Sequence, residues 1–82
     1  MHQVVIYGKP DCCLCDEAKL LLRKLEVSHR FAWREVNILD DPETHERYKN
    51  EIPVVFIDGK KAFKYRIDEK EFVRRMSLGV KP

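Results

Sequence analysis

Three cysteines lie close together near the N-terminus of this 82-residue chain. Cys12 and Cys15 are separated by two residues, one of which is Cys13. A Cys-x-x-Cys pair supports two kinds of chemistry, which are reversible thiol–disulfide exchange and the coordination of a soft metal ion by thiolates. The position of the pair in the fold decides between them, so the neighbouring elements carry more information than the spacing alone.

The cysteines lie between a predicted strand and a predicted helix. Residues 4–7 form a continuous run of β-branched and aromatic residues, which is typical of a central strand buried on both faces. Apolar residues then recur at helical spacing from Leu14 to Leu25, with charged residues on the other faces. The helix is therefore expected to begin among residues 11–13, so that the cysteines lie at its start.

Cys12 and Cys15 form the expected redox pair. Side chains three residues apart in a regular helix have Cβ atoms about 5–6 Å apart, which is wider than the roughly 3.8 Å of a disulfide. We expect Cys12 at the non-helical cap position, where this gap closes with little backbone movement. A disulfide between Cys12 and Cys13 would need a strained ring, and Cys13 and Cys15 point to different faces of the helix.

The start of the helix gives the two thiols different roles. Free backbone amides and the partial positive charge of the helix favour a thiolate at Cys12, and Lys9 adds to this effect. Cys12 is therefore the predicted attacking nucleophile, and Cys15, deeper in the first turn, is the predicted resolving thiol. Three nearby acids oppose the thiolate as like charges, so we expect a moderate effect.

The alternative is a non-catalytic module that binds a metal ion or an iron–sulfur cluster through Cys12, Cys13 and Cys15. A structural zinc site needs four ligands, and the three histidines neither pair at metal-binding spacing nor lie near the cysteines in the sequence. We therefore favour redox chemistry without a metal or a dissociable cofactor. Cys13 is then a small residue that fills an N-terminal helix position.

The rest of the chain predicts a mixed sheet. Turn residues and changes of periodicity give these further elements: a strand over 31–39, a short helix over 42–49, a strand over 52–57, a hairpin turn at Asp58-Gly59, a strand over 62–65 and a final helix that Asp68 caps. A helix between the first two strands implies parallel pairing, whereas the hairpin forces antiparallel pairing. We therefore expect an α/β fold of order βαβαββα, with a four-stranded mixed sheet flanked by helices and residues 1–82 as a single domain.

Two segments resemble the glutaredoxin family. Residues 5–15 are similar to the active-site segment of glutaredoxins, and residues 52–59 are similar to their proline segment. The resemblance is closer to the short glutaredoxin-like family, which has a Cys-x-Leu-Cys core followed by an acid, an Asp-Pro-Glu helix start and an Ile-Pro-Val strand. It covers nearly the whole chain and implies a thioredoxin-like fold with the sheet order 2-1-3-4.

The resemblance also implies where substrates bind. It implies a cis peptide bond before Pro53. This bond would leave the backbone of Ile52 free to pair with an extended substrate beside the cysteines. Lys9 matches a lysine that holds a glutathione carboxylate in glutaredoxins. Phe63-Lys64 stands about where glutathione-binding members have a glycine pair, so we expect weak glutathione binding. The implied activity is reduction of a protein disulfide or a glutathione mixed disulfide by Cys12 and Cys15.

Composition and charge limit the other functions. The chain is 44% hydrophobic and 37% charged, which is typical of a folded soluble protein, and its apolar runs are far too short to span a bilayer. Residues 60–82 carry eight basic and three acidic residues, but no nucleic-acid motif accompanies them. We expect a monomer that binds neither nucleic acid nor a membrane. The odd number of cysteines and the lack of a leader predict a cytoplasmic location.

Overall fold

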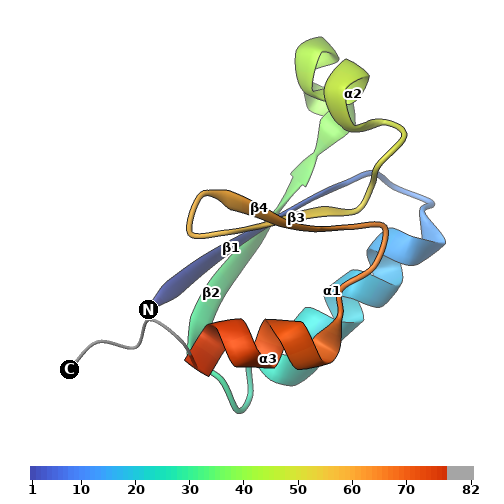
Figure 1. Ribbon diagram of the computed structural model, residues 1–82. Coiled ribbons are helices and arrows are strands. Elements are labelled where there is room, and N and C mark those ends of the chain that lie inside the picture. The colour runs from blue at the N-terminus through green and yellow to red at the C-terminus, as the bar shows by residue number, and fades with distance from the viewer. Residues whose placement is uncertain (78–82) are drawn as a thin grey trace.

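Four strands and three helices make up an α/β fold in the computed structural model, which describes residues 1–77. The elements in chain order are β1 (His2–Gly8), α1 (Cys13–Leu25), β2 (Phe31–Asn37), the 3₁₀ turn η1 (Ile38–Asp40), α2 (Pro42–Tyr48), β3 (Val54–Ile57), β4 (Lys60–Lys64) and α3 (Glu69–Ser77). Figure 1 shows their arrangement. The predicted order of strands and helices is therefore confirmed.

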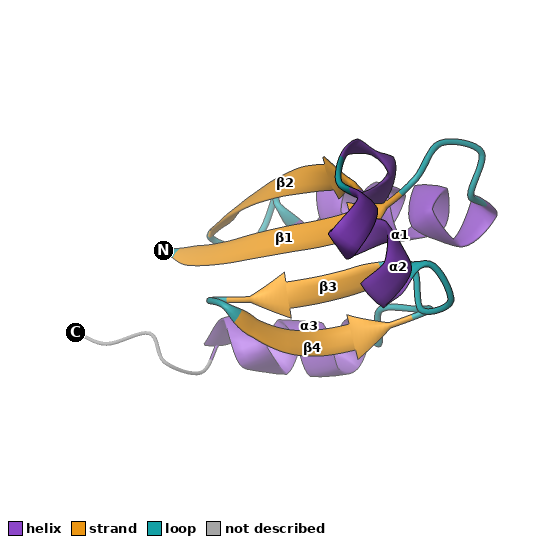
Figure 2. Cartoon of the chain, turned by 90° about the horizontal axis from the view of Figure 1, so that it is seen from above, coloured by secondary structure: helices purple, strands orange, loops and turns teal. Residues whose placement is uncertain are grey.

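The strands form one mixed sheet in the order β2-β1-β3-β4, as expected. β1 is central, because it pairs with β2 in parallel and with β3 antiparallel, and β4 pairs antiparallel with β3. Figure 2 shows α1 and α3 behind the sheet and α2 in front of it, near the end of β1. The loop from β1 to α1 and the first turn of α1, which together carry the cysteines, thus lie at the end of the central strand.

The main core lies between the sheet and the two helices α1 and α3. It contains these buried residues: Val4, Ile6, Ala18, Leu22, Leu25, Phe31, Val55, Ile57, Phe72 and Met76. Phe31 and Phe72 pack edge to face with their ring centroids 5.2 Å apart. Burial of each large apolar side chain contributes about 1.5–3 kcal/mol, so this core fixes α1 on the sheet.

The opposite face of β1 is less buried than expected. Val5 and Tyr7 on this face are only half-buried, because α2 has seven residues and covers one end of the sheet. The Tyr7 ring packs against Tyr48 of α2 and Phe56 of β3, with centroids 5.1 and 5.4 Å away. These aromatic rings cover the sheet close to the end at which the cysteines lie.

The second strand ends earlier than predicted. We expected a strand as far as residue 39, but β2 ends at Asn37. The Asn37 side-chain oxygen accepts a hydrogen bond from the backbone N–H of Leu39 at 2.9 Å, which turns the chain into η1. This turn buries Ile38 completely beside Cys15.

The two strands of the hairpin are displaced relative to the prediction. β3 begins at Val54 rather than at Ile52, because Pro53 has no backbone N–H to contribute to the ladder. β4 runs over Lys60–Lys64 rather than 62–65. Asp58 and Gly59 both have positive φ, at 51° and 84°, so a two-residue turn lets pairing begin at once.

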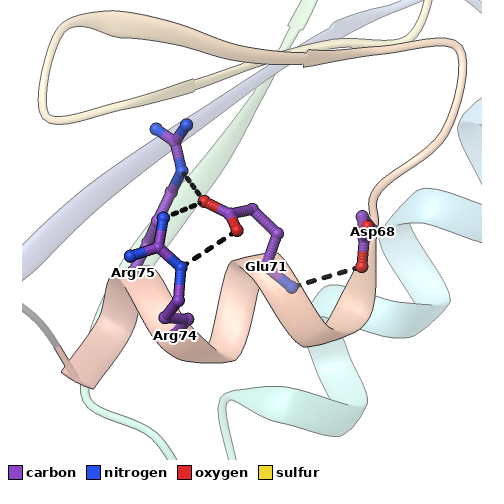
Figure 3. Close-up of polar contacts among 4 residues, drawn as sticks. All are labelled: Asp68, Glu71, Arg74 and Arg75. Atoms are coloured by element: carbon purple, nitrogen blue, oxygen red, sulfur yellow. Dashed lines mark hydrogen bonds and ion pairs between the residues drawn. The ribbon is translucent and has the colours of Figure 1, made fainter.

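The basic C-terminal part of the chain is partly neutralised within α3, as Figure 3 shows. The Glu71 carboxylate accepts hydrogen bonds from Nε of Arg74 and Nε of Arg75, each at 3.0 Å. Asp68 caps the helix by accepting the backbone N–H of Glu71 at 3.2 Å. Lys81, which the sequence adds to this basic segment, lies outside the described residues. No helix within residues 1–77 is long and apolar enough to cross a membrane.

Candidate active site

Cys12 is the N-cap residue of α1. Its backbone is extended, with φ −109° and ψ 111°, and its carbonyl accepts the first helical hydrogen bond from Asp16 at 3.0 Å. The Cys12 sulfur accepts the backbone N–H of Cys15 at 3.3 Å. A backbone amide at the start of the helix therefore points at a half-exposed sulfur.

Cys15 lies one turn further along α1 and is completely buried. Burial and then the neighbouring Cys12 raise the pKa of its thiol, a hydrogen bond from the Lys9 backbone lowers it, and the net effect is a rise from 9.0 to about 12. Cys15 is therefore a neutral thiol at physiological pH. Cys12 is thus partly accessible to solvent, and Cys15 is buried.

Cys13 differs from the other two cysteines in its exposure. Its side chain is exposed, whereas Cys12 is half-buried and Cys15 is buried, and all three are free thiols. Within residues 1–77 no group of three cysteine, histidine or acidic side chains is placed to hold a metal ion. The described residues therefore offer a pair of thiols with one exposed neighbour and no three-thiolate site.

The proline segment lies against the cysteine pair. Ile52 is buried and packs in one cluster with Cys15 and Ile38, and Cys12 contacts the same cluster. The peptide bond between Ile52 and Pro53 is cis. The Pro53 carbonyl accepts the backbone N–H of Tyr65 at 2.9 Å, but Ile52 makes no backbone hydrogen bond to any residue in 1–77. The main chain of Ile52 is thus available to an extended ligand beside Cys12.

The side chain of Lys9 is exposed. Its backbone lowers the pKa of Cys15 through a hydrogen bond. The sequence assigned Lys9 to substrate binding through its ammonium group. This role of Lys9 stays a prediction.

A small cleft lies beside the first turns of α1. Its volume is about 130 Å³, and it lies between the start of α1 and the loop that follows β4. These residues line it: Leu14, Glu17, Ala18, Leu21, Tyr65, Arg66 and Ile67. Tyr65 is exposed and has a positive φ of 70°, an unusual conformation for a bulky residue, where its N–H is held by Pro53.

The residues at the expected glycine pair carry large side chains. Phe63 packs against the main core, and the guanidinium of Arg75 lies 5.8 Å from its ring centroid. Lys64 is exposed, with Nζ 5.6 Å from the ring centroid of Tyr65. Asp68, the acid that begins the next helix, is occupied as a cap of α3. Side chains thus fill the position at which paired glycines would let a ligand approach the backbone.

The chain is similar to a known protein family over nearly its whole length. The family described as glutaredoxin-like domain (DUF836) matches residues 3–77 of the chain. The chain belongs to this glutaredoxin-like family. The resemblance found in the sequence is therefore confirmed, and it extends over the whole fold described above.

Individual relatives of this glutaredoxin-like domain agree with the assignment. The glutaredoxin-like protein YDR286C homolog of Dictyostelium discoideum is 38% identical over 71 residues, covering 77% of this chain and 64% of that protein. Protein Ne2328 from Nitrosomonas europaea has a similar structure, with a TM-score of 0.81, 27% identity and coverage of 93% and 92% of the two chains. Glutaredoxin from Brucella melitensis has a TM-score of 0.62, 25% identity and coverage of 92% and 80%. The fold of the domain is thus thioredoxin-like, as expected.

Two charged residues of the glutaredoxin-like domain were missed by the sequence analysis. Lys19 of α1 and Glu35 of β2 form an ion pair, with Nζ and Oε2 3.1 Å apart. Glu35 shares the helix-facing side of β2 with Phe31 and Trp33, because it pairs with buried Ile6 of β1. An acid on the apolar side of an alternating strand was the available signal.

Proposed function

We propose that this domain is a thiol–disulfide oxidoreductase that reduces a protein disulfide or a glutathione mixed disulfide through Cys12 and Cys15. The single observation that carries the proposal is the difference between the two cysteines. Cys12 lies at the helix cap, half-exposed, with a helix amide on its sulfur, and Cys15 lies buried one turn away. This is the arrangement that an attacking thiolate and a resolving thiol require.

The reaction proceeds in two exchanges. The Cys12 thiolate attacks a substrate disulfide, forms a mixed disulfide and releases the first substrate thiol. Cys15 then attacks the Cys12 sulfur, so that the Cys12–Cys15 bond forms and the second substrate thiol leaves. Two electrons pass from the dithiol to the substrate, and a cellular reductant regenerates the two thiols. No dissociable cofactor takes part.

A protein disulfide is the better substrate of the two. The unpaired backbone of Ile52 offers main-chain hydrogen bonds to an extended peptide whose disulfide is attacked at Cys12. Glutathione depends more on close approach to backbone amides, and Phe63 and Lys64 occupy that position with side chains. The nearby basic residues are exposed, so each contributes only about 0–1 kcal/mol to binding the carboxylates of glutathione.

Three serine variants test the roles of the cysteines. Cys12→Ser should abolish turnover of every disulfide substrate, because the nucleophile is lost. Cys15→Ser should trap a mixed disulfide on Cys12, which mass spectrometry of the intact protein detects. Cys13→Ser is the matched control, since its exposed side chain lies outside the pair, and it should keep disulfide formation intact.

The same variants separate this function from metal binding. A non-catalytic carrier that used Cys12, Cys13 and Cys15 would lose its function equally in all three serine variants. Protein purified without chelator would also carry a soft metal or iron and sulfide in proportion to the chain. Equal loss of turnover in Cys13→Ser and Cys12→Ser, together with bound metal, would contradict the proposed exchange mechanism.

A further inference from the structure

The cleft beside the first turns of α1 adjoins the cysteine pair. Leu14, the residue before Cys15, lines it on one side, and Tyr65 and Arg66 of the loop that joins β4 to α3 line it on the other, where Figure 1 shows this loop passing near α1. Its volume of about 130 Å³ is smaller than the roughly 300–1,000 Å³ of pockets that enclose a whole small molecule. A space of this size suits one side chain of a larger substrate.

Tyr65 joins this cleft to the proline segment. Its backbone N–H donates to the carbonyl of Pro53 at 2.9 Å and to the carbonyl of Glu51 at 3.3 Å, and these two residues flank Ile52. An extended peptide that pairs with Ile52 would therefore pass close to Tyr65. Because an extended chain advances about 3.3 Å per residue, a side chain one or two positions from the substrate cysteine would reach the cleft.

Tyr65 is held in a conformation that its residue type does not favour. Its φ is 70°, a left-handed value that costs free energy at a bulky residue. The residue is nevertheless 46% exposed, so burial of its ring does not offset this cost. Backbone strain of this kind is concentrated at sites that bind ligands. The two hydrogen bonds to the proline segment thus fix an exposed aromatic ring at the side of the cleft.

Positive charge exceeds negative charge at this cleft. Neither Arg66 nor Glu17, the two charged residues that line it, forms an ion pair with another residue in 1–77. Lys64 adds a second positive charge, with Nζ 5.6 Å from the ring centroid of Tyr65. Asp68 on the same loop is occupied as the cap of α3. The remaining lining residues are apolar: Leu14, Ala18, Leu21 and Ile67.

We propose that this cleft binds an acidic side chain of the substrate, within two residues of the cysteine that Cys12 attacks, and that Arg66 selects it. The inference rests on the proposed function and names the class of protein disulfide that the site prefers. The carboxylate pairs with the guanidinium of Arg66, and the methylene groups pack beside the ring of Tyr65. Glu17 limits the preference, because it repels the same carboxylate.

A series of mixed disulfides tests this preference. Short peptides with one cysteine carry Glu, Gln or Lys at one of the two positions before or after it, and the cysteine is joined to thionitrobenzoate. Reduced protein in a Cys13→Ser background is mixed with each peptide. Cys12 attacks the peptide sulfur, the mixed disulfide with the peptide forms, and the coloured aromatic thiolate leaves. Its rate of release measures how well each peptide binds at the site.

At the preferred position, the Glu peptide should react roughly fivefold faster than the Lys peptide, with the Gln peptide between them. Arg66→Glu should reverse this order, and Glu17→Gln should widen it. Arg34→Glu is the matched control, because Arg34 is an exposed arginine of β2, at the opposite edge of the sheet from β4. It changes the net charge by the same amount as Arg66→Glu and should keep the order of the parent.

Tyr65→Gly separates substrate binding from folding. Glycine adopts a φ of 70° without strain, so the Tm of this variant should not fall. Loss of the ring should nevertheless reduce the preference for the Glu peptide, because one side of the cleft is removed. A preference that stays at the parent value in Tyr65→Gly would overturn the placement of the acidic side chain in this cleft.

The remaining outcomes distinguish the inference from the proposed function. Equal rates for the three peptides, or an order that Arg34→Glu reverses as readily as Arg66→Glu, overturn the inference while the exchange mechanism stands. If Arg66→Glu slows the glutathione–thionitrobenzoate disulfide as much as that of the Glu peptide, Arg66 serves glutathione and the assignment to a peptide side chain is overturned. If intact-protein mass spectrometry shows that the peptide stays on Cys12 and is never released by Cys15, the proposed function itself fails.

Discussion

The two thiols of the pair differ in their access to solvent. Cys15 has no exposed surface and a pKa raised to about 12, whereas Cys12 and Cys13 reach solvent. We predict that iodoacetamide at neutral pH labels Cys12 and Cys13 in the native protein and leaves Cys15 unmodified. Peptide mass spectrometry checks this, with a sample labelled in denaturant as the control. Rapid native labelling of Cys15 would show that the buried site opens freely.

The raised pKa of Cys15 also links stability to pH. The folded pKa of about 12 lies above the unfolded value of 9.0, so this contribution to stability is complete below pH 9 and is lost as the pH rises towards 12. The reduced parent should therefore lose stability relative to Cys15→Ala by about 1.4 kcal/mol for each pH unit above 9. Urea unfolding at several pH values measures the difference. Parallel curves for the two proteins would contradict the prediction.

Gly8 is required for lack of space and not for its backbone conformation. A methyl group at Gly8 would lie 2.8 Å from the Cys15 sulfur, whereas Gly59 has open space but a φ of +84°. We predict that Gly8→Ala costs about 1–3 kcal/mol through overpacking, and that Gly59→Ala costs about 1–2 kcal/mol through its backbone. Urea unfolding in a Cys15→Ala background separates the causes, because only the cost of Gly8→Ala should fall there. An unchanged cost would rule out the clash with the sulfur.

At the scale of elements, α3 depends on an ion-pair cluster. Hydrogen bonds from Arg74 and then from Arg75 lower the pKa of Glu71 from 4.5 to about 2. Its stabilising contribution is therefore present above pH 4.5 and is lost as the pH falls towards 2. Glu71→Gln should lower the Tm modestly at neutral pH, and the gap to the parent should close near pH 2. Thermal unfolding across this range tests it, and a gap that persists at pH 2 would point to packing instead.

The elements were predictable where local chemistry decides them. α1 followed from the apolar spacing and from Cys12 as its cap, and the Asp58-Gly59 turn followed from its residue types. Strand ends were less predictable, because distant or competing groups set them. The side chain of Asn37 ends β2, and the missing amide of Pro53 delays β3.

The candidate site, like the elements, was predictable from the sequence only in part. Cys12, Cys15 and Ile52 come together because two short motifs end beside the central strand, and motif order reveals this in the sequence. Glu35 comes close to Gly8 only through the register that pairs it with Ile6. Strand register depends on pairing across the sheet, so no local pattern reports it.

The whole molecule presents different surfaces to its two candidate substrates. Under the proposed function, a peptide would pair with the free backbone of Ile52, while glutathione would encounter the side chains of Phe63 and Lys64. We predict that kcat/KM is at least about tenfold lower for a glutathione mixed disulfide than for a protein disulfide, equivalent to about 1.4 kcal/mol of lost contacts. Activity with the glutathione substrate should fall further with added salt. Robust, salt-insensitive turnover of the glutathione substrate would refute this preference.

The closeness of β1 to the Cys15 sulfur has a consequence under peroxide stress. An oxidised cysteine sulfur gains oxygen atoms, and a sulfur that would lie 2.8 Å from a methyl group on Gly8 has little room for them on that side. Under the proposed function, a sulfenic acid formed at Cys12 would condense with the Cys15 thiol to a disulfide and release water. A reductant can reverse this oxidation of the protein, whereas irreversible sulfinic and sulfonic acids are expected on the exposed Cys13.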